Sequence, residues 1–319
     1  MLGGAVGAAV LALSGCEVRL EDDAPPIPLI PAREPIPAEP DLLWLLADCQ
    51  DLAEVDGPYT DLYVEQVAVL RSALFRAGIP IDTLDELLAP PAPGATEASP
   101  ASGADSPRPE PTLTTSTATA TATRGPQTGP EAALRRIDEL SRCGPGIFPV
   151  IASLLAQRWA AVTLGGGVLP PSVRRTDPAY RWQFPHLAVG FVEVTHPAVY
   201  GFEIVAAQTG ETRDDAIATL TSLRGLRREQ NARAGGTAPD PAFGYPLPFP
   251  VDSEESALRL ATHVLAGLTD GYGGLLTTVT GSAQEDTAMD VVGWLGAAAA
   301  LAAGWGAPLE AFPGTQVSS

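Results

Sequence analysis

The chain has 319 residues, enough for two domains of ordinary size. Its formal net charge of −19 argues against a nucleic-acid partner, because a phosphate backbone is bound by Lys and Arg and would be repelled by an acidic protein. Aromatic residues make up only 6% of the sequence, which favours packed helices over a β-sandwich.

The chain opens with an apolar stretch that ends in a cysteine, "GGAVGAAVLALSGC". An apolar run closed by small residues is typical of a secretory signal peptide, here residues 1–15. The order Leu13-Ser14-Gly15-Cys16 resembles a bacterial lipobox, in which Cys16 carries the lipid. The alternative is a plain secretory signal with an incidental cysteine. No Lys or Arg precedes the apolar run, which we interpret as a start placed too far downstream; inefficient export is the other explanation. We expect a lipid anchor at the extracytoplasmic face of the cell membrane.

Residues 16–40 are rich in proline, which breaks helices, and are predicted to form an extended spacer. Apolar residues at helical spacing follow in a first block, residues 41–167. They predict helices in residues 41–55, 61–78, 131–145 and 146–167. Residues 89–130 are a Pro/Ala/Ser/Thr-rich insertion with too little apolar content to offset chain entropy. We expect a four-helix bundle with a disordered insertion in one of its loops.

Residues 168–183 are predicted to connect this block to a second one. Arginine and aromatic side chains are concentrated here in an otherwise acidic chain, and such residues are favoured at binding hot spots. The candidate partner or ligand contacts are Arg174, Arg175, Tyr180, Arg181 and Trp182. The alternative is a structural connector whose aromatic rings are wedged between two bundles.

The second block, residues 184–314, is predicted to hold four helices. The last three open with patterns like a capping box, Thr212-x-x-Asp215, Asp252-x-x-Glu255 and Ser282-x-x-Glu285. A long loop, "GTAPDPAFGYPLPFPVD", joins the second helix to the third. Four helices with one long crossover is the connectivity of a ferritin-like bundle.

Several stretches of this block resemble a known family. They are "HLAVGFVEVTHPAVYGFEIVAA", "TLTSLRGLRREQNA", "FGYPLPFPVDSEESALRLA" and "ALAAGWGAPLEAFPG". They look like the ferritin-like domain of unknown function found in actinobacterial lipoproteins, and the start "CEVRLEDDAPPIPLIP" also looks like that family. The resemblance implies a helical bundle and no particular activity. We interpret the first block as a diverged second copy, so the expected fold is all-α, with two ferritin-like four-helix bundles in tandem.

A possible metal site begins with Glu193-x-x-His196, half of a di-iron motif when it projects into a bundle. At about 100° per residue, however, Glu193, His196 and Glu203 lie opposite the apolar stripe of their helix. His263 lies opposite the stripe of the third helix, and no second Glu-x-x-His is present. Pro197, directly after His196, cannot donate to the Glu193 carbonyl, so it is expected to kink or start a helix there. We predict a solvated face, and the alternative is a metal centre built from Glu193, His196, Glu203 and His263.

Two arginines and two cysteines complete the candidate residues. Arg158 and Arg227 fall on apolar stripes, either as inward charges that bind an anionic ligand or a structural carboxylate, or as long side chains that reach the edge of the bundle. After export, Cys49 and Cys143 would be the remaining thiols in an oxidising compartment, so a disulfide between them is a possibility that the compartment alone supports.

The predicted function is a non-catalytic binding or scaffolding component of the cell envelope, without a cofactor. Its expected partners are the membrane, through the lipid anchor, and an unknown envelope protein or small ligand, but no nucleic acid. The alternative is a metal-dependent ferritin-like oxidoreductase, with di-iron or manganese, or an iron-storage relative. A third possibility is a ligand carrier with a pocket between the two bundles.

Overall fold

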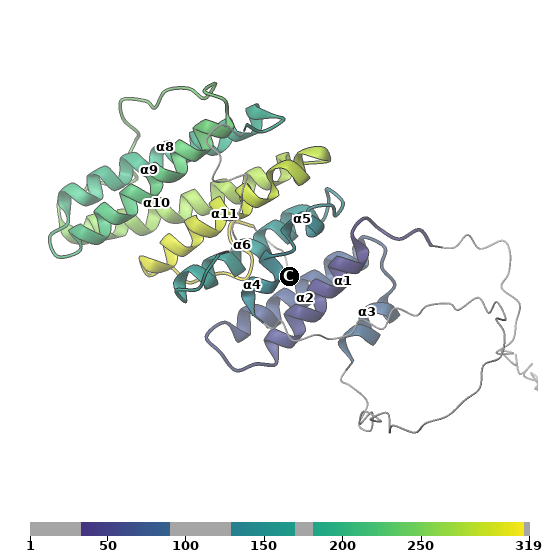
Figure 1. Cartoon of the computed structure of the whole chain (residues 1–319). Coiled ribbons are helices and arrows are strands. Elements are labelled where there is room, and N and C mark those ends of the chain that lie inside the picture. The colour runs from purple at the N-terminus through teal and green to yellow at the C-terminus, as the bar shows by residue number, and fades with distance from the viewer. Residues whose placement is uncertain (1–32, 90–128, 170–180, 316–319) are drawn as a thin grey trace, which may run out of the picture. The chain divides into compact units, whose positions relative to one another are not determined.

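The computed structural model describes residues 33–89, 129–169 and 181–315, and every regular element in these ranges is a helix. The chain divides into two units, Met1–Glu34 and Pro35–Ser319, and the helices within the described ranges belong to the second. The α-helices are α1 (Glu39–Ala53), α2 (Thr60–Arg76), α3 (Ile81–Leu88), α4 (Pro130–Leu134), α5 (Ile137–Leu140), α6 (Phe148–Leu164), α8 (Pro185–Gln208), α9 (Arg213–Arg233), α10 (Glu254–Leu275) and α11 (Ser282–Gly304) (Figure 1). The prediction of an all-α fold is confirmed. Most of the Pro/Ala/Ser/Thr-rich insertion lies outside the described residues.

The four long helices of the second block pack side by side (Figure 1). Helix α8 contacts α9 and α10, and α10 contacts α11. The crossover loop, residues 236–252, leads from α9 to α10. This is the expected connectivity, with one long connection among four helices.

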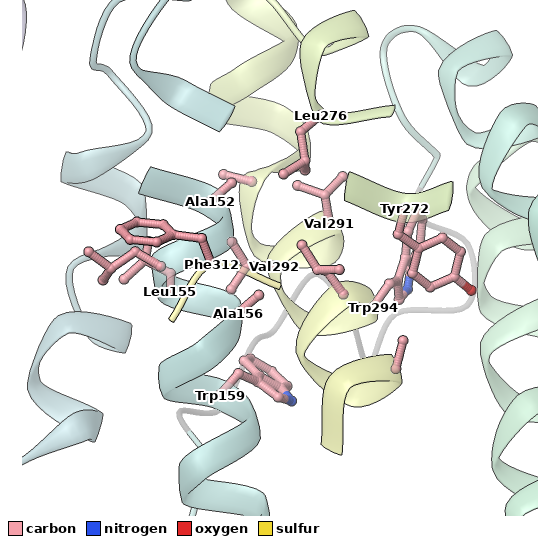
Figure 2. Close-up of a cluster of buried hydrophobic side chains, with 14 of the residues drawn as sticks. Ala152, Leu155, Ala156, Trp159, Tyr272, Leu276, Val291, Val292, Trp294 and Phe312 are labelled. Atoms are coloured by element: carbon pink, nitrogen blue, oxygen red, sulfur yellow. The ribbon is translucent and has the colours of Figure 1, made fainter. Parts of the chain in front are cut away.

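Helix α6 of the first block packs against α11 of the second, so one apolar core contains residues from both blocks. Figure 2 shows small side chains of α6, Ala152 and Ala156, beside Val292 of α11. A Cβ atom at Gly296 of α11 would collide with the side chain of Trp159 of α6, so glycine is required for this close approach. The division into two separate bundles stays a prediction.

One helical stretch in the part of the chain that the structure describes, Ala283–Gly304, is long and apolar enough to cross a membrane. However, 72% of its most apolar window is buried inside the protein. That degree of burial is what a central core helix requires, because its whole circumference faces other helices.

Helix boundaries differ from the predicted ones where side chains cap the backbone. Helix α10 begins after Ser253, whose hydroxyl accepts from the Ser256 amide at 3.2 Å, while the Ser256 hydroxyl accepts from the Ser253 amide at 3.0 Å. The expected cap at Asp252 is therefore displaced by one residue. Thr212 precedes α9 but makes no capping bond. At α11 the cap is Gly281, whose amide donates to Gln284 Oε1 at 3.0 Å.

Two further differences concern the first block. The single helix predicted for residues 131–145 is two short helices, α4 and α5, and the sequence did not indicate α3.

In the second block, Pro197 lies inside α8, which continues through it to Gln208, about three turns further on.

The C-terminal strap, residues 305–315, fastens the bundle at its end. The Ala311 carbonyl accepts from Gln66 Nε2 of α2 at 2.9 Å, and the Pro313 carbonyl accepts from Ser153 Oγ of α6 at 2.7 Å. A Cβ atom at Gly273 of α10 would collide with the Gly314 carbonyl, so the strap lies directly on that helix. The strap thus joins helices of both blocks.

Candidate functional site

A closed hydrogen-bonded triad lies among α8, α9 and α10. Thr195 Oγ1 donates to Gln230 Oε1 at 2.7 Å and lies 2.6 Å from Tyr272 Oη, which accepts from Gln230 Nε2 at 2.7 Å. All three side chains are fully buried. Burial raises the pKa of Tyr272 to about 12, so the phenol stays neutral. The sequence did not indicate this triad, although Tyr272 lies on the apolar stripe of its helix.

Aromatic rings fill the space beside the triad. Phe191 packs against Tyr272 and Trp294, with ring centroids 5.5 and 5.1 Å away. Trp182 stacks on Trp294 at 5.1 Å, and its Nε1 donates to Asp290 Oδ2 at 2.8 Å. Figure 2 places Tyr272 and Trp294 next to each other in the core.

The four residues of the alternative metal site are not brought together as a ligand set. Glu193, Glu203 and His263 are exposed, and Glu203 is paired with Arg224 at 2.7 Å. Within the described ranges, no three His, Cys, Asp or Glu side chains gather closely enough to hold a metal ion. The centre of this bundle therefore presents Thr, Gln and Tyr where a di-iron centre would need carboxylates and imidazoles.

His196 is buried, with 4% of its surface exposed, so its placement on a solvated face was wrong. The helical spacing correctly turns His196 away from the bundle core, but the side of α8 that it faces is covered by the crossover loop. Pro239 and Asp240 of that loop lie near the imidazole, and Arg227 of α9 approaches it as well. Burial and then Arg227 lower the pKa of His196. Neither ring nitrogen has a hydrogen-bond partner among the residues described.

Arg158 points inward and is fully buried. This is the alternative in which the inward charge is paired with a carboxylate of the protein itself. Its Nη2 lies 3.8 Å from Asp48 Oδ2 and 3.3 Å from Cys49 Sγ. The guanidinium also lies over the Tyr63 ring, 4.1 Å from the centroid. Burial raises the pKa of Asp48 to about 6, although Arg158 opposes the shift. Arg227, by contrast, is only partly buried.

The two cysteines are not bridged, so the disulfide prediction is wrong for this structure. Cys49 is enclosed between Arg158 and Gln66, whereas the Cys143 carbonyl accepts from Gln284 at the start of α11. The two thiols thus face different neighbours. Burial raises the pKa of Cys49 to about 11 and that of Cys143 to about 12, so neither thiol is activated.

The connector residues have different fates. Arg174, Arg175 and Tyr180 lie outside the described residues, as does Cys16. Trp182 is in the core, where its ring contacts Phe191 and Trp294 of the second block, and Asp290 joins it to Arg233, whose Nε donates at 2.7 Å. Arg181 is exposed, beside Gly235 at the end of α9.

An apolar pocket of about 320 Å³ lies between α8, α10 and the crossover loop. Its walls come from aliphatic residues of both helices and from Tyr245 to Pro248 of the loop. The polar side chains in the lining are Tyr200, Tyr245 and His263, and the two tyrosine rings lie 5.7 Å apart. Pro197 and three glycines also line it, and a Cβ atom at Gly201 would lie 2.8 Å from Val264. Gly267 and Gly271 lie four residues apart on α10, and this spacing of small residues is the sequence feature from which the site could have been expected.

A second pocket, of about 450 Å³, is acidic. It lies beside the C-terminal strap and is lined by Glu65, Asp270 and Glu310, among others. Burial, Asp270 and Glu65 together raise the pKa of Glu310. The three carboxylates do not form a metal-binding group.

Comparison with known proteins places the apolar pocket in a domain that recurs elsewhere. No curated protein and no solved structure matches the chain. A family model matches residues 190–317, which include the triad, His196 and every residue that lines the apolar pocket. This range agrees with the resemblance expected over residues 184–314. The matching family is described as a domain of unknown function, DUF4439.

Proposed function

We propose that this protein is a lipid-anchored, non-catalytic binding component on the extracytoplasmic face of the cell membrane. Its ligand binds in the apolar pocket between α8, α10 and the crossover loop. The pocket carries this proposal, because its volume of about 320 Å³ lies within the range of roughly 300–1,000 Å³ that is usual for small-molecule sites.

The chemistry of the lining supports binding more than catalysis. Its polar side chains are two tyrosines and one histidine, and no carboxylate, cysteine or serine lines the pocket beside them. General acid–base catalysis commonly pairs groups of different pKa, and nucleophilic catalysis requires an activated nucleophile beside its base. The hydroxyl and amide groups of the nearby triad are used in hydrogen bonds to one another and to the Phe191 carbonyl, 2.7 Å from Thr195 Oγ1.

A metal-dependent oxidoreductase or iron-storage role is supported less well. Such a bundle needs carboxylates and histidines that project inward from all four helices. Here Glu193 and Glu203 face outward, and Thr195, Gln230 and Tyr272 occupy the interior.

Analysis of protein purified from its own membranes without chelator tests the two functions together. We expect metal analysis to find substoichiometric iron and manganese, and mass spectrometry of a denatured extract to find an organic molecule enriched with the protein. Stoichiometric iron or manganese without an organic ligand would favour the oxidoreductase or storage role instead.

A further inference from the structure

The apolar pocket has the features of a site for one compact molecule. It is bounded by two helices and the segment from Tyr245 to Pro248. The volume of about 320 Å³ is close to the lower end of the range for ligand sites, so a molecule of one or two rings fits better than a long chain.

The walls determine which charge the ligand can carry. The lining contains no Asp, Glu or Arg side chain, so an ionised ligand would lose hydration without gaining an ion pair. An anion is further opposed by the net charge of −19, which repels it before it reaches the pocket. A cation would be attracted to the protein but would find no carboxylate in the lining.

The rim determines which polar group the ligand can use. Tyr200 and Tyr245 both line the pocket, with ring centroids 5.7 Å apart and ring planes at 58°, so they offer aromatic surface to a ring in the ligand. His263 lines the pocket from α10 and offers hydrogen-bonding nitrogens. A single hydroxyl or carbonyl group on the ligand can be satisfied there.

We propose that the pocket selects neutral, ring-containing molecules with one hydrogen-bonding group. The proposal rests on the proposed function, because it names the ligand class of the same pocket. The preference for a ring arises from the paired tyrosine rings, and the preference for a neutral molecule arises from the lining, which has no Asp, Glu or Arg side chain.

Gly267 provides a variant that fills the pocket. It lines the pocket from α10, and a Cβ atom added there meets no atom within 4 Å, so a side chain can extend into the open space. Gly274 lies on the same helix, also meets no atom within 4 Å and does not line the pocket. Gly267→Phe and Gly274→Phe therefore make matched variants with the same loss of backbone freedom.

A naphthalene series tests the ligand class, with 2-naphthol as the neutral probe, naphthalene-2-sulfonate as the anion and 2-naphthyl-trimethylammonium as the cation. Fluorescence anisotropy is measured in about 0.15 M salt, which screens surface charge beyond roughly 8 Å. We expect 2-naphthol to bind with one-to-one stoichiometry and about tenfold or more tightly than either ion. Gly267→Phe should weaken 2-naphthol binding about tenfold or more, and Gly274→Phe should leave it unchanged.

Each other outcome overturns a defined part of the proposal. If an ion binds as tightly as 2-naphthol and Gly267→Phe abolishes its binding, the charge preference is wrong and the pocket stands. If no probe binds, the ligand class is wrong; the proposed function then still stands if a co-purified molecule is lost in Gly267→Phe. If 2-naphthol binds equally to wild type and Gly267→Phe, the pocket is not the site. Circular dichroism confirms folding, and Gly267→Leu serves if Gly267→Phe does not fold.

Discussion

Phe191 is fully buried at the point where α8, α10, α11 and the connector meet. Its ring contacts those of Trp182, Tyr272 and Trp294. Phe191→Ala should lower the free energy of unfolding by about 3–5 kcal/mol, because it removes buried apolar surface and leaves a cavity. Phe243 is fully exposed on the crossover loop, so Phe243→Ala should change the free energy of unfolding by less than about 0.5 kcal/mol. Urea unfolding measures both, and equal losses would mean that the Phe191 ring is not in the core.

His196 should make stability depend on pH. Its pKa is lowered in the folded state, so between that pKa and the ordinary value of about 6.5 the unfolded chain binds more protons. The free energy of unfolding should therefore fall as the pH drops below about 7. Arg227 adds to this effect, whereas Pro239, Glu193 and Asp240 oppose it.

The comparison of His196→Gln with His263→Gln isolates this contribution. His196→Gln should lose less stability than wild type between about pH 7.5 and about pH 5.5, since it has no imidazole to protonate. His263 is exposed, so His263→Gln should follow the wild type. An identical pH dependence in all three proteins would show that the loop does not bury His196.

At this scale the sequence predicted neighbours along a helix but not neighbours across the fold. Phe191, Phe202 and Tyr272 lie at helical spacing on the apolar stripes of their helices, and all three are buried in the core. It could not place His196, because burial there depends on a loop more than forty residues away in the chain. For the same reason it could not show that Asp48 of α1 is the partner of Arg158 of α6.

Helix α10 depends on its first turn, where Ser253 and Ser256 satisfy each other's backbone amides. Ser253→Ala should lower the free energy of unfolding by about 1 kcal/mol, because an amide at the helix start loses its acceptor. Thr212 precedes α9 without making a capping bond, so Thr212→Ala should cost less than about 0.5 kcal/mol. Thermal unfolding gives the change in Tm for each variant. Equal changes for Ser253→Ala and Thr212→Ala would show that the Ser253 bonds contribute nothing to stability.

Long helices were the elements that the sequence predicted best. The apolar stripes of α1, α2, α6 and the four helices of the second block gave their positions within a few residues. Short elements were predicted less well: α3, of eight residues, was missed, and α4 and α5, of five and four residues, were predicted as one helix. Such helices owe their stability to tertiary contacts rather than to their own pattern, so local periodicity is a poor guide to them.

At the scale of the whole molecule, the packing of α6 on α11 could not be predicted from the sequence. Both helices were predicted, but which apolar face meets which is decided by close contacts such as that of Gly296 with Trp159. The apolar pocket was likewise unexpected in its place: it lies inside the second block, between α8 and α10, and not between two bundles.

The proposed lipid anchor can be tested by asking whether the protein leaves the membrane fraction when Cys16 is replaced. Cys16→Ser removes the residue that would carry the acyl chains, and two chains suffice for stable attachment to a membrane. The variant should appear in the soluble fraction after cell lysis, while the wild type sediments with membranes until detergent is added. A variant that stays with the membranes just as the wild type does would show that Cys16 is not the anchor.

Binding in the apolar pocket is most directly tested by the mass of the intact protein, released gently from its membrane and measured by native mass spectrometry. The wild type and Gly274→Phe should each carry one adduct beyond the lipid anchor, and Gly267→Phe should lack it, because its side chain occupies the open space of the pocket. An adduct retained at full occupancy in Gly267→Phe, or wild type with no adduct at all, would contradict a ligand-binding function for this pocket.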